Sequence, residues 1–264
     1  MQVAQVMITP DMAQDFLDSN TSNRPVKRNH LSFLVREIEA GRWKKNGDPI
    51  RIGKDGSLVD GQHRLLAVVQ TGVPIATVLI TELDPDVFDT IDSGACRSHG
   101  DTLSVAGEKN GRNLAAALIV ADELLAGKTE FTRTKKTSNA EILEMMDRHS
   151  AIKQSLYWGK PIGKFAPFSI SVALHYLFHQ VSPSKADAFF GAIHTGIGLE
   201  FDSPVYLLRQ RLIDNATAKG KMTRRYMVAL FIKAWNAYSC SRKLKNLRFR
   251  ETGDAPEAFP CLQM

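Results

Sequence analysis

The chain of 264 residues contains few cysteines and no long apolar run. Its three cysteines, Cys96, Cys240 and Cys261, are far apart and odd in number, so they build neither a disulfide framework nor a paired metal motif. The sequence has no run of about 18 apolar residues, so we expect no transmembrane helix. The first residues have no basic region leading into an apolar stretch, which argues against a signal peptide. We therefore expect a cytoplasmic protein without a membrane partner.

Acidic residues are absent from one long segment near the C-terminus. Between Lys219 and Arg250 there are ten basic residues and no Asp or Glu, which leaves 24 basic and 28 acidic residues elsewhere. This asymmetry predicts a polyanionic partner, DNA in the first place. The alternative is a solvated basic face around a packed aromatic core. The side chains expected to contact phosphates are those of Lys221, Arg224, Arg225, Arg242, Lys243, Lys245, Arg248 and Arg250.

Capping residues and apolar spacing predict mixed structure in the first part of the chain. Thr9 and Pro10 begin a helix that ends near Asp18, and a second helix covers about 26–40. Short strands at 49–52 and 58–59 flank a turn at 54–56, and a helix at 62–70 ends at Gly72. A buried strand at 75–81 and a short helix from Asp84 follow.

The remainder of the chain has the pattern of helices alone. Apolar spacing predicts helices at 114–125, 169–180, 185–193, 205–215 and 224–239, and a capping box at Ser138 opens another. After the last helix, residues 242–250 alternate basic and apolar side chains, which is typical of a strand or an extended arm. We predict an α+β fold, with a mixed domain over 1–105 followed by an all-α domain over 106–264.

The segment Asp60-Gly61-Gln62-His63-Arg64 carries the clearest chemical signal. A strand leads into an Asp-Gly turn and a helix begins at once, so unpaired N–H groups and the positive end of the helix dipole face the turn. A phosphate group is a natural occupant, and Gly61 allows its close approach. His63 and Arg64 add side-chain donors, while Asp60 can cap the helix, hold the arginine or help bind a nucleotide's Mg²⁺. The alternative is a common turn followed by a solvated first helical turn.

These five residues, with Ala67 after them, are similar to the DGQHR signature of the ParB/sulfiredoxin superfamily. The stretch around Asn23 and Arg24, with the helix after it, also resembles the opening of that family. Residues 89–98 are similar to a segment of ParB-like proteins in phages and mobile elements. The resemblance covers about residues 8–105 and extends weakly to the basic helix near Trp235.

The resemblance implies binding of ATP, ADP or CTP, with Mg²⁺, at the helix start. It implies that Asn23, Arg24 and Arg97 close the nucleotide site formed by residues 60–64. The family's activities are diverse: DNA clamps switched by nucleotides, sulfinic acid reduction, phosphorylation of free serine and proposed nuclease action. Gln62 stands where sulfiredoxins have cysteine, so the reductase chemistry is set aside. ATP or CTP is the expected cofactor, in the cytoplasm of a bacterial host if the protein is encoded by a phage.

Candidate catalytic groups follow from the same segment. Asp60 and His63 lie at the expected phosphate site, and Glu37, with Glu39, lies on a helix that flanks the nucleotide in the family. A carboxylate there could accept a proton from an attacking hydroxyl group or water, although exposed helix glutamates are far commoner. Asp89 and Asp92 could line the same cleft or cap a turn.

Two further patterns are weaker. Cys96 and His99 have the spacing of half a zinc site but no second pair of ligands. His175 and His179 lie one turn apart on an apolar helix, without the glutamate of a zinc protease motif, and we interpret them as partly buried helix residues.

Three functions remain open on the sequence. The first is a nucleotide-binding ParB-like protein that hydrolyses ATP or CTP, or transfers its phosphate, on or near DNA. The second is a DNA-binding regulator without turnover. The third is a ParB-like nuclease, which no dense cluster of Asp, Glu and His supports.

Overall fold

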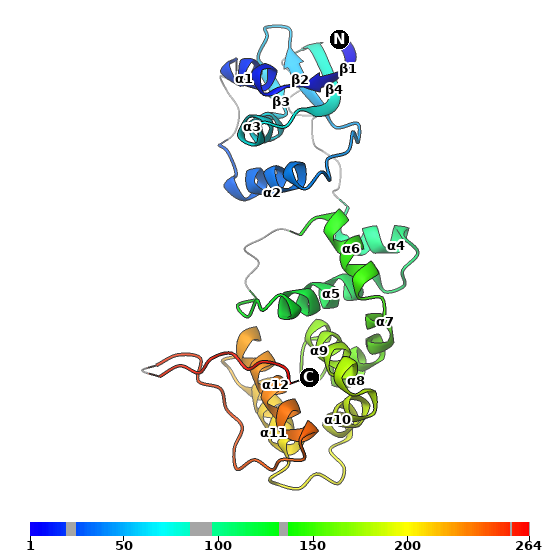
Figure 1. Cartoon of the computed structure of the whole chain (residues 1–264), viewed down its shortest axis with the longest axis vertical. Helices are drawn as coiled ribbons and strands as arrows, with labels where there is room; N and C mark the ends of the chain where they lie inside the picture. The colour runs from blue at the N-terminus through cyan, green and yellow to red at the C-terminus, as the bar shows by residue number, and fades with distance from the viewer. Residues whose placement is uncertain (20–24, 85–96, 132–136, 254, 264) are drawn as a thin grey trace. The chain divides into compact units, whose positions relative to one another are not determined.

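The computed structural model describes residues 1–19, 25–84, 97–131, 137–253 and 255–263 (Figure 1). The chain divides into two compact units. The N-terminal unit comprises residues 1–96 with 133–136, and the helical unit comprises 97–132 with 137–264. The helical unit begins before residue 105, the boundary expected from the sequence, because helix α4 (His99–Val105) packs on α5 (Gly111–Leu125). Gly100 and Gly111 permit this close packing, since a Cβ atom on either would overlap the other helix.

The N-terminal unit contains a four-stranded sheet in the order β1-β4-β2-β3. β1 (Gln2–Ile8) pairs antiparallel with β4 (Ile75–Leu83), β2 (Pro49–Gly53) lies parallel to β4, and β3 (Leu58–Asp60) pairs antiparallel with β2. Strands β2, β3 and β4 confirm the expected ones within two residues. Strand β1 was not expected. Ile8 alone in β1 is buried, so the strand has little of the apolar alternation by which a half-buried strand is recognised.

Three helices complete the N-terminal unit: α1 (Pro10–Asp18), α2 (Arg28–Glu39) and α3 (Gln62–Thr71). The expected cap of α1 is confirmed, since the Thr9 hydroxyl oxygen accepts a hydrogen bond from the N–H of Met12 at 3.3 Å. Gly72 ends α3 in the left-handed conformation, as the sequence predicts. Helix α3 packs against both α1 and α2. The shared core contains Ile8, Ala13, Val35, Ile38, Ile50, Ile52, Leu58, Leu65, Ala67, Val68 and Ile75.

The hairpin between β2 and β3 turns where the sequence predicts it. The N–H of Gly53 donates to the carbonyl oxygen of Ser57 at 2.9 Å, and Gly56 has a φ of 79°. Glycine is required at position 56 because other residues rarely adopt this conformation. The helix expected from Asp84 onward falls mostly on residues outside the described part of the chain.

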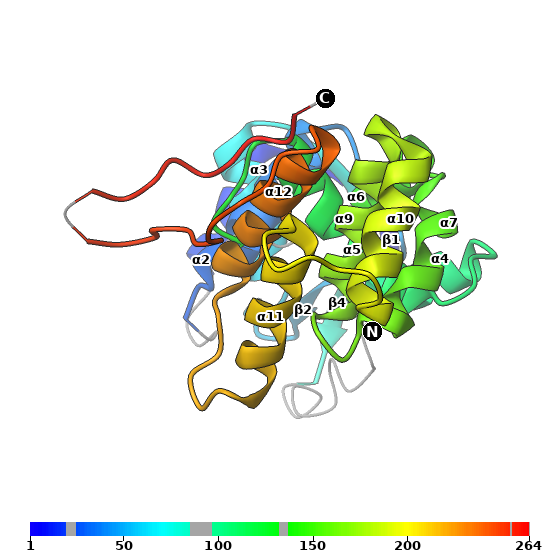
Figure 2. The same ribbon diagram turned by 90° about the horizontal axis from the view of Figure 1, so that it is seen from below.

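Every regular element that the structure describes after residue 97 is helical (Figure 2). After α4 and α5 come α6 (Asn139–Arg148), α7 (Ile152–Ser155), the 3-10 helix η2 (Leu156–Trp158), α8 (Gly159–Ile162), α9 (Phe168–Val181), α10 (Pro183–Thr195), α11 (Pro204–Thr217) and α12 (Arg224–Ser239). The capping box at Ser138 and Glu141 is confirmed. None of the described helices is long and apolar enough to cross a membrane.

The segment after α12 is neither a strand nor a free arm over most of its length. Leu247 and Phe249 are buried in the helical core. The side chain of Asn236 on α12 donates to the carbonyl oxygen of Cys261 at 2.8 Å and accepts from the N–H of Gln263 at 3.2 Å. The expected alternation of basic and apolar residues is thus real, but the apolar residues pack on helices instead of on a neighbouring strand.

His175 on α9 is the most deeply buried histidine in the helical core. Its Nδ1 lies 2.8 Å from the Ser155 hydroxyl oxygen, and its Nε2 lies 3.0 Å from a carboxylate oxygen of Asp187. Burial lowers the pKa of His175 to about 4, although the hydrogen bond and charge of Asp187 act in the opposite direction. The neutral imidazole is therefore part of the folded state, with Trp158 stacked on its ring.

We expect this burial to make stability depend on pH. Between about pH 6.5, the ordinary histidine pKa, and about pH 4, the unfolded chain binds a proton at His175 that the folded chain does not. The free energy of unfolding should therefore fall as the pH is lowered through this window, by up to about 3 kcal/mol from this residue. Urea denaturation of His175→Gln should show a correspondingly smaller pH dependence. His194→Gln, which removes an exposed histidine, is the control; equal slopes in the two variants would contradict the assignment.

Candidate functional site

The turn between β3 and α3 depends on Gly61. This residue is the N-cap of α3 with a φ of 112°, in the left-handed region that favours glycine. A Cβ atom there would also lie only 3.0 Å from Cγ1 of Ile50 on the neighbouring strand. Both the conformation and the space therefore require glycine. Gly61 is thus the single residue between Asp60, the last residue of β3, and Gln62, the first residue of α3.

The carboxylate of Asp60 gathers three donors at this turn. One oxygen accepts hydrogen bonds from Arg51 at 2.6 Å and from Arg64 at 2.9 Å, and the other accepts from the N–H of Gly61 at 2.7 Å. The three side chains are between 16 and 24% exposed, so water weakens these ion pairs less than it does on an open surface. Of the roles expected for Asp60, holding the arginine is the one that the structure shows.

Arg51 is the site residue that the sequence did not reveal. It lies on β2 directly opposite Asp60 of β3 in the register of the hairpin. The hairpin turn at residues 54–56 was visible in the sequence, but a register shift between Arg51 and Ile52 alters the pairing that simple counting from the turn gives. Cross-strand counting with one extra residue would have found the pair.

The start of α3 retains capacity for an anion. Gly61 supplies no side-chain cap, and the first hydrogen bond of the helix runs from the N–H of Leu65 to the carbonyl oxygen of Gly61. The main-chain N–H groups of the first turn and the helix dipole make this end positive. The first turn contains no acidic residue that would neutralise it.

Two buried side-chain atoms at the same helix start have no hydrogen-bond partner among the described residues. They are Nη1 of Arg64, a donor, and Oε1 of Gln62, an acceptor. A buried polar atom without a partner costs about 1–3 kcal/mol, so such atoms are rare in folded proteins. Asp60 uses the other terminal nitrogen of Arg64, which leaves Nη1 directed elsewhere.

His63 is buried, and its ring joins two helices. Its Nε2 accepts a hydrogen bond of 3.0 Å from the N–H of Lys27, the N-cap residue of α2, and its ring lies 5.0 Å from that of His30. An Nε2 that accepts a main-chain N–H carries no proton of its own. This nitrogen holds the beginning of α2 beside α3 and is not available as a general base in this geometry.

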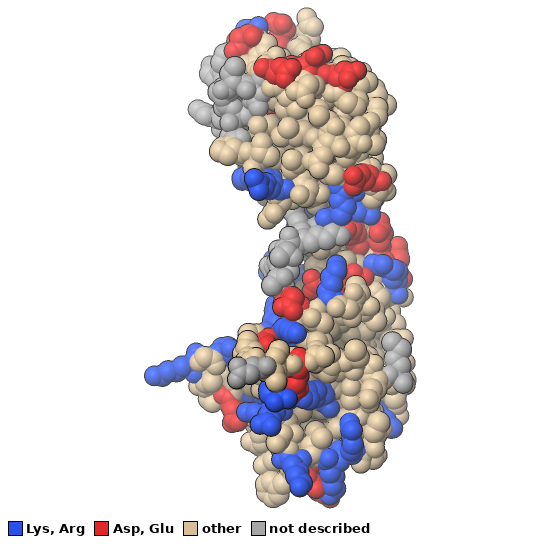
Figure 3. Space-filling view, turned by 60° about the vertical axis from the view of Figure 1, so that its left-hand side comes forward, with Lys and Arg blue, Asp and Glu red and all other residues tan. Residues whose placement is uncertain are grey.

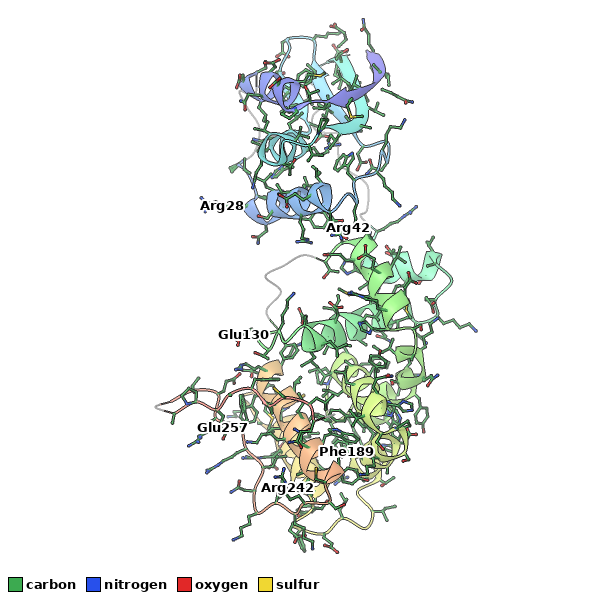
Figure 4. The ribbon with its side chains drawn as sticks, in the orientation of Figure 1. Arg28, Arg42, Glu130, Phe189, Arg242 and Glu257 are labelled. Carbon is green, nitrogen blue, oxygen red and sulfur yellow. The ribbon has the colours of Figure 1, made fainter. Side chains whose placement is uncertain are left out.

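Glu37 is likewise engaged. Both of its carboxylate oxygens accept hydrogen bonds from Arg42 (labelled in Figure 4), at 2.8 and 3.2 Å, and the residue is 8% exposed. The bidentate pair ties the end of α2 to the chain that follows it and accounts for the burial of this acid. Glu39, the other candidate on α2, is exposed to solvent.

Several predicted site residues are not placed at this site. Asn23, Arg24, Asp89, Asp92 and Cys96 lie outside the described residues. Arg97 belongs to the helical unit, and its side chain is exposed. The pKa of Asp101 is lowered mainly by hydrogen bonds from Ser98, and to a smaller extent by the charges of Arg112 and Arg97. His99 is hydrogen-bonded through Nε2 to the carbonyl oxygen of Thr137.

No three His, Cys, Asp or Glu side chains come together as a metal site within the described ranges. At the start of α3, the three donors on Asp60 leave this carboxylate little capacity to bind a magnesium ion directly. The donors present fit phosphate oxygens. A magnesium ion that accompanies a nucleotide would be held mainly by the phosphates themselves.

Of the eight predicted nucleic-acid-binding side chains, those of Arg225, Lys243 and Arg250 pair with acids from other parts of the helical unit. Lys243 binds Glu200 at 2.6 Å and Asp202 at 3.1 Å, and Arg250 lies 3.5 Å from Glu257. Lys221 donates to two main-chain carbonyl oxygens near the end of α11. On the face shown in Figure 3, acidic and basic side chains are interspersed over this unit. The segment is basic in sequence, but its surface is not uniformly so.

Arg225, one of the side chains expected to contact phosphates, lies against aromatic rings of the C-terminal segment and is 20% exposed. Its guanidinium group lies 5.5 Å from the ring centre of Phe249 and 5.2 Å from that of Phe259. It also pairs with Glu130 at 3.4 Å and Glu251 at 3.8 Å. Arg225 therefore fastens the C-terminal segment to α12 through cation–π contacts and ion pairs.

Arg242 and Arg248 differ from these residues, because no salt bridge to a described acid involves either. Both line a cavity of about 360 Å³ beside α12, together with Lys233 and Glu257, which pair at 2.6 Å. The hydrogen bond from Lys233 is the largest cause that lowers the pKa of Glu257. The positive charges of Arg250 and Arg248 lower it further. The cavity thus has an excess of positive charge.

The histidines of α9 do not form a metal site in the described structure. Ser155, His175 and Asp187 are hydrogen-bonded in the order found in serine hydrolases, but here the serine is buried and the aspartate faces the solvent. Ser155 is 2% exposed and out of reach of a substrate, whereas the side chain of Asp187 is 58% exposed. The set stabilises the helical core.

We expect Asp60→Ala to destabilise the N-terminal unit by about 1.5–3 kcal/mol, because it leaves two partly buried guanidinium groups without their carboxylate. Hydrogen exchange of the α3 amides reports on this unit separately from the helical one. Asp84→Ala, which removes an exposed partner of Lys54, is the matched control and should change stability by less than about 0.5 kcal/mol. Unchanged protection of α3 in Asp60→Ala would show that the arginine pair contributes nothing.

Comparison of the chain with protein-family models, with curated proteins and with solved structures found no match. The candidate site is consequently defined by its own geometry: a glycine turn, an uncapped helix start, and one arginine held by a carboxylate with a second nitrogen unpaired. These are the features of a site for an anion.

Proposed function

We propose that the N-terminal unit binds the phosphate groups of a nucleotide, ATP or CTP, at the start of α3. The observation that carries this proposal is the buried Nη1 of Arg64, which has no partner among the described residues and belongs to the first turn of an uncapped helix. A phosphate oxygen supplies the acceptor that this donor needs and the negative charge that the helix start favours. The resemblance of residues 60–64 to the ParB/sulfiredoxin signature supports the same ligand class.

Each residue of the segment then has a separate task. Main-chain N–H groups of α3 and Nη1 of Arg64 bind phosphate oxygens, while Asp60 fixes Arg64 by its other nitrogen. Gly61 allows the phosphate to come close to the backbone. Oε1 of Gln62 is an acceptor, so it suits a donor on the ligand, such as a ribose hydroxyl or the amino group of a base.

The same contacts favour binding over turnover. Asp60, His63 and Glu37 are the candidate catalytic groups, and each already accepts hydrogen bonds from donors of the chain. A general base needs a free acceptor within reach of the attacking group. We therefore propose a nucleotide-dependent switch acting on or near DNA, with hydrolysis or phosphate transfer as the alternative.

Isothermal titration with ATP, CTP, GTP and ADP in the presence of Mg²⁺ tests the phosphate site. Arg64→Gln should weaken the binding of the preferred nucleotide at least about tenfold, because hydrogen bonds to charged groups contribute about 1.5–3 kcal/mol. Lys54→Gln, which removes an exposed cation of the same unit, should leave affinity within about twofold. Equal affinity of Arg64→Gln and the unaltered chain would overturn the proposal.

Gln62→Met separates binding from folding at this site. The substitution replaces a buried acceptor without a partner by an apolar chain of similar length, so the N-terminal unit should be as stable as before or more stable. Nucleotide affinity should fall at the same time if Oε1 contacts the ligand. A loss of both stability and affinity would instead identify Gln62 as a structural residue.

A second candidate function for the chain is contact with nucleic acid by the helical unit. The observation that favours it is the cavity beside α12, which is lined by Lys233, Arg242 and Arg248 against one acid, Glu257, and in which the described acids form no salt bridge with Arg242 or Arg248. Arg242 (labelled in Figure 4) and Arg248 come from the segment that follows α12. Two such arginines near one another can bind successive phosphates of a nucleic-acid backbone.

Fluorescence anisotropy with duplex DNA over a salt series distinguishes these arginines from the paired cations. The double variant Arg242→Gln, Arg248→Gln should weaken binding and reduce the salt slope by about two, because each lost phosphate contact removes about one counterion. Lys243→Gln is the control, since Glu200 and Asp202 already neutralise that lysine. Equal losses in the double variant and the control would assign the binding to net charge alone.

A further inference from the structure

Strand β1 forms one edge of the sheet, and this edge is open. Among the described residues only β4 pairs with it. Gln2, Val3, Ala4, Gln5 and Met7 are exposed, with Val3 at 61% and Met7 at 56%. Along such an edge every second residue directs its N–H and C=O groups away from the sheet, where another strand can form hydrogen bonds with them.

Within its own residues β1 lacks the features that usually protect an edge, and the Lys45 side chain donates to Oε1 of Gln5 at 2.6 Å. Its residues Gln2–Ile8 include no charged side chain and no proline. Its pairing with β4 runs without a bulge from Gln2 to Ile8. Natural edge strands are normally interrupted by lysine, proline or a bulge, because a flat uncharged edge recruits other strands. A strand without them is competent to pair.

The opposite edge of the sheet is closed to such pairing. There β3 has only three residues, ends at Asp60 and leads directly into α3. The hairpin that it forms with β2 also contains a register shift. An assembly through β1 therefore uses the one long edge of each sheet and ends with two copies instead of growing into a fibre.

We propose that β1 pairs antiparallel with β1 of a second copy of this chain, around a two-fold axis at Gln5. This register places Val3 opposite Met7 of the partner strand and Ala4 opposite Val6. Each pair joins residues of the same sheet face, so at these four positions apolar side chains meet apolar side chains, while Gln5 lies opposite Gln5 and Gln2 opposite Ile8, and the two sheets continue as one. The lack of charge on β1 and this self-complementarity identify a second copy as the occupant.

The pairing also covers apolar surface that is exposed in the single chain. Val3 and Met7 lie on the sheet face opposite Ile8, beside Ile80 and Ala76 of β4. In the dimer Val3 of each copy contacts Met7 of the other, which gives two apolar pairs, one on each side of the Gln5 residues at the axis. The proposal does not depend on nucleotide binding at α3 and concerns a different part of the unit.

Light scattering coupled to size-exclusion chromatography tests the proposal on the full chain. The unaltered chain should reach twice its 29.3 kDa as concentration rises. Val3→Glu should weaken dimerisation at least about tenfold, because two carboxylates then face methionine side chains across the axis. Val73→Glu, at an exposed valine of the same unit outside β1, is the matched control and should leave the dimer intact.

A charge pair tests the register. Adding Met7→Lys to Val3→Glu should restore the dimer, since each new carboxylate then lies opposite a new ammonium group of the partner strand. Within one chain the two positions are too far apart along the strand to pair. A monomer throughout the dilution series, or a dimer that Val3→Glu leaves intact, would overturn the proposal. Dimer loss in Val3→Glu without rescue would overturn the register at Gln5. Circular dichroism confirms that the variants remain folded.

Discussion

The carboxylate of Asp60 is the constraint on which the candidate site depends. By accepting from Arg51 on β2, Arg64 on α3 and the N–H of Gly61, it joins a strand, a helix and the turn between them. One nitrogen of Arg64 is thereby fixed, so the direction of the other is fixed as well. A guanidinium group held in this way loses less conformational entropy when an anion binds than a free one does. The acid thus prepares the arginine for a ligand that the acid itself does not touch.

The neighbouring polar residues serve the scaffold more than the chemistry. His63 holds the beginning of α2, and Glu37 with Arg42 secures its end. These contacts place α2 firmly beside α3, where a loose helix would leave the site ill-defined. At the start of α3, the buried polar atoms without a partner in the described part of the chain belong to Arg64 and Gln62. The start of α3 therefore combines a fixed donor on Arg64 with candidate bases, Asp60, His63 and Glu37, that already accept hydrogen bonds from the chain.

In the helical unit, the fold pairs several basic side chains with acids that are distant in the sequence. The ten basic residues between Lys219 and Arg250 are contiguous in sequence, but acids from distant positions lie against several of them. Arg225 lies beside two phenylalanine rings that also contact each other, where it stabilises the packing of the C-terminal segment. Arg242 and Arg248 differ because they line a cavity with an excess of positive charge and form no salt bridge with a described acid. The basic character of a segment is therefore a poor measure of the surface that it presents.

The sequence by itself determined the local elements of this protein. Thr9, Gly72 and the capping box at Ser138 mark helix ends through contacts with neighbours in the chain, and apolar spacing located most helices and three strands. It also located the glycine turn before α3, because an Asp-Gly pair between a strand and a helix needs no distant partner. Only the tertiary structure decided the rest. The pairing of β1 with β4, the Arg51–Asp60 contact and the acids that neutralise Lys243 all join residues far apart in the chain or shifted in register. Local propensity contains no term for such contacts, because their free energy arises only when folding brings the partners together.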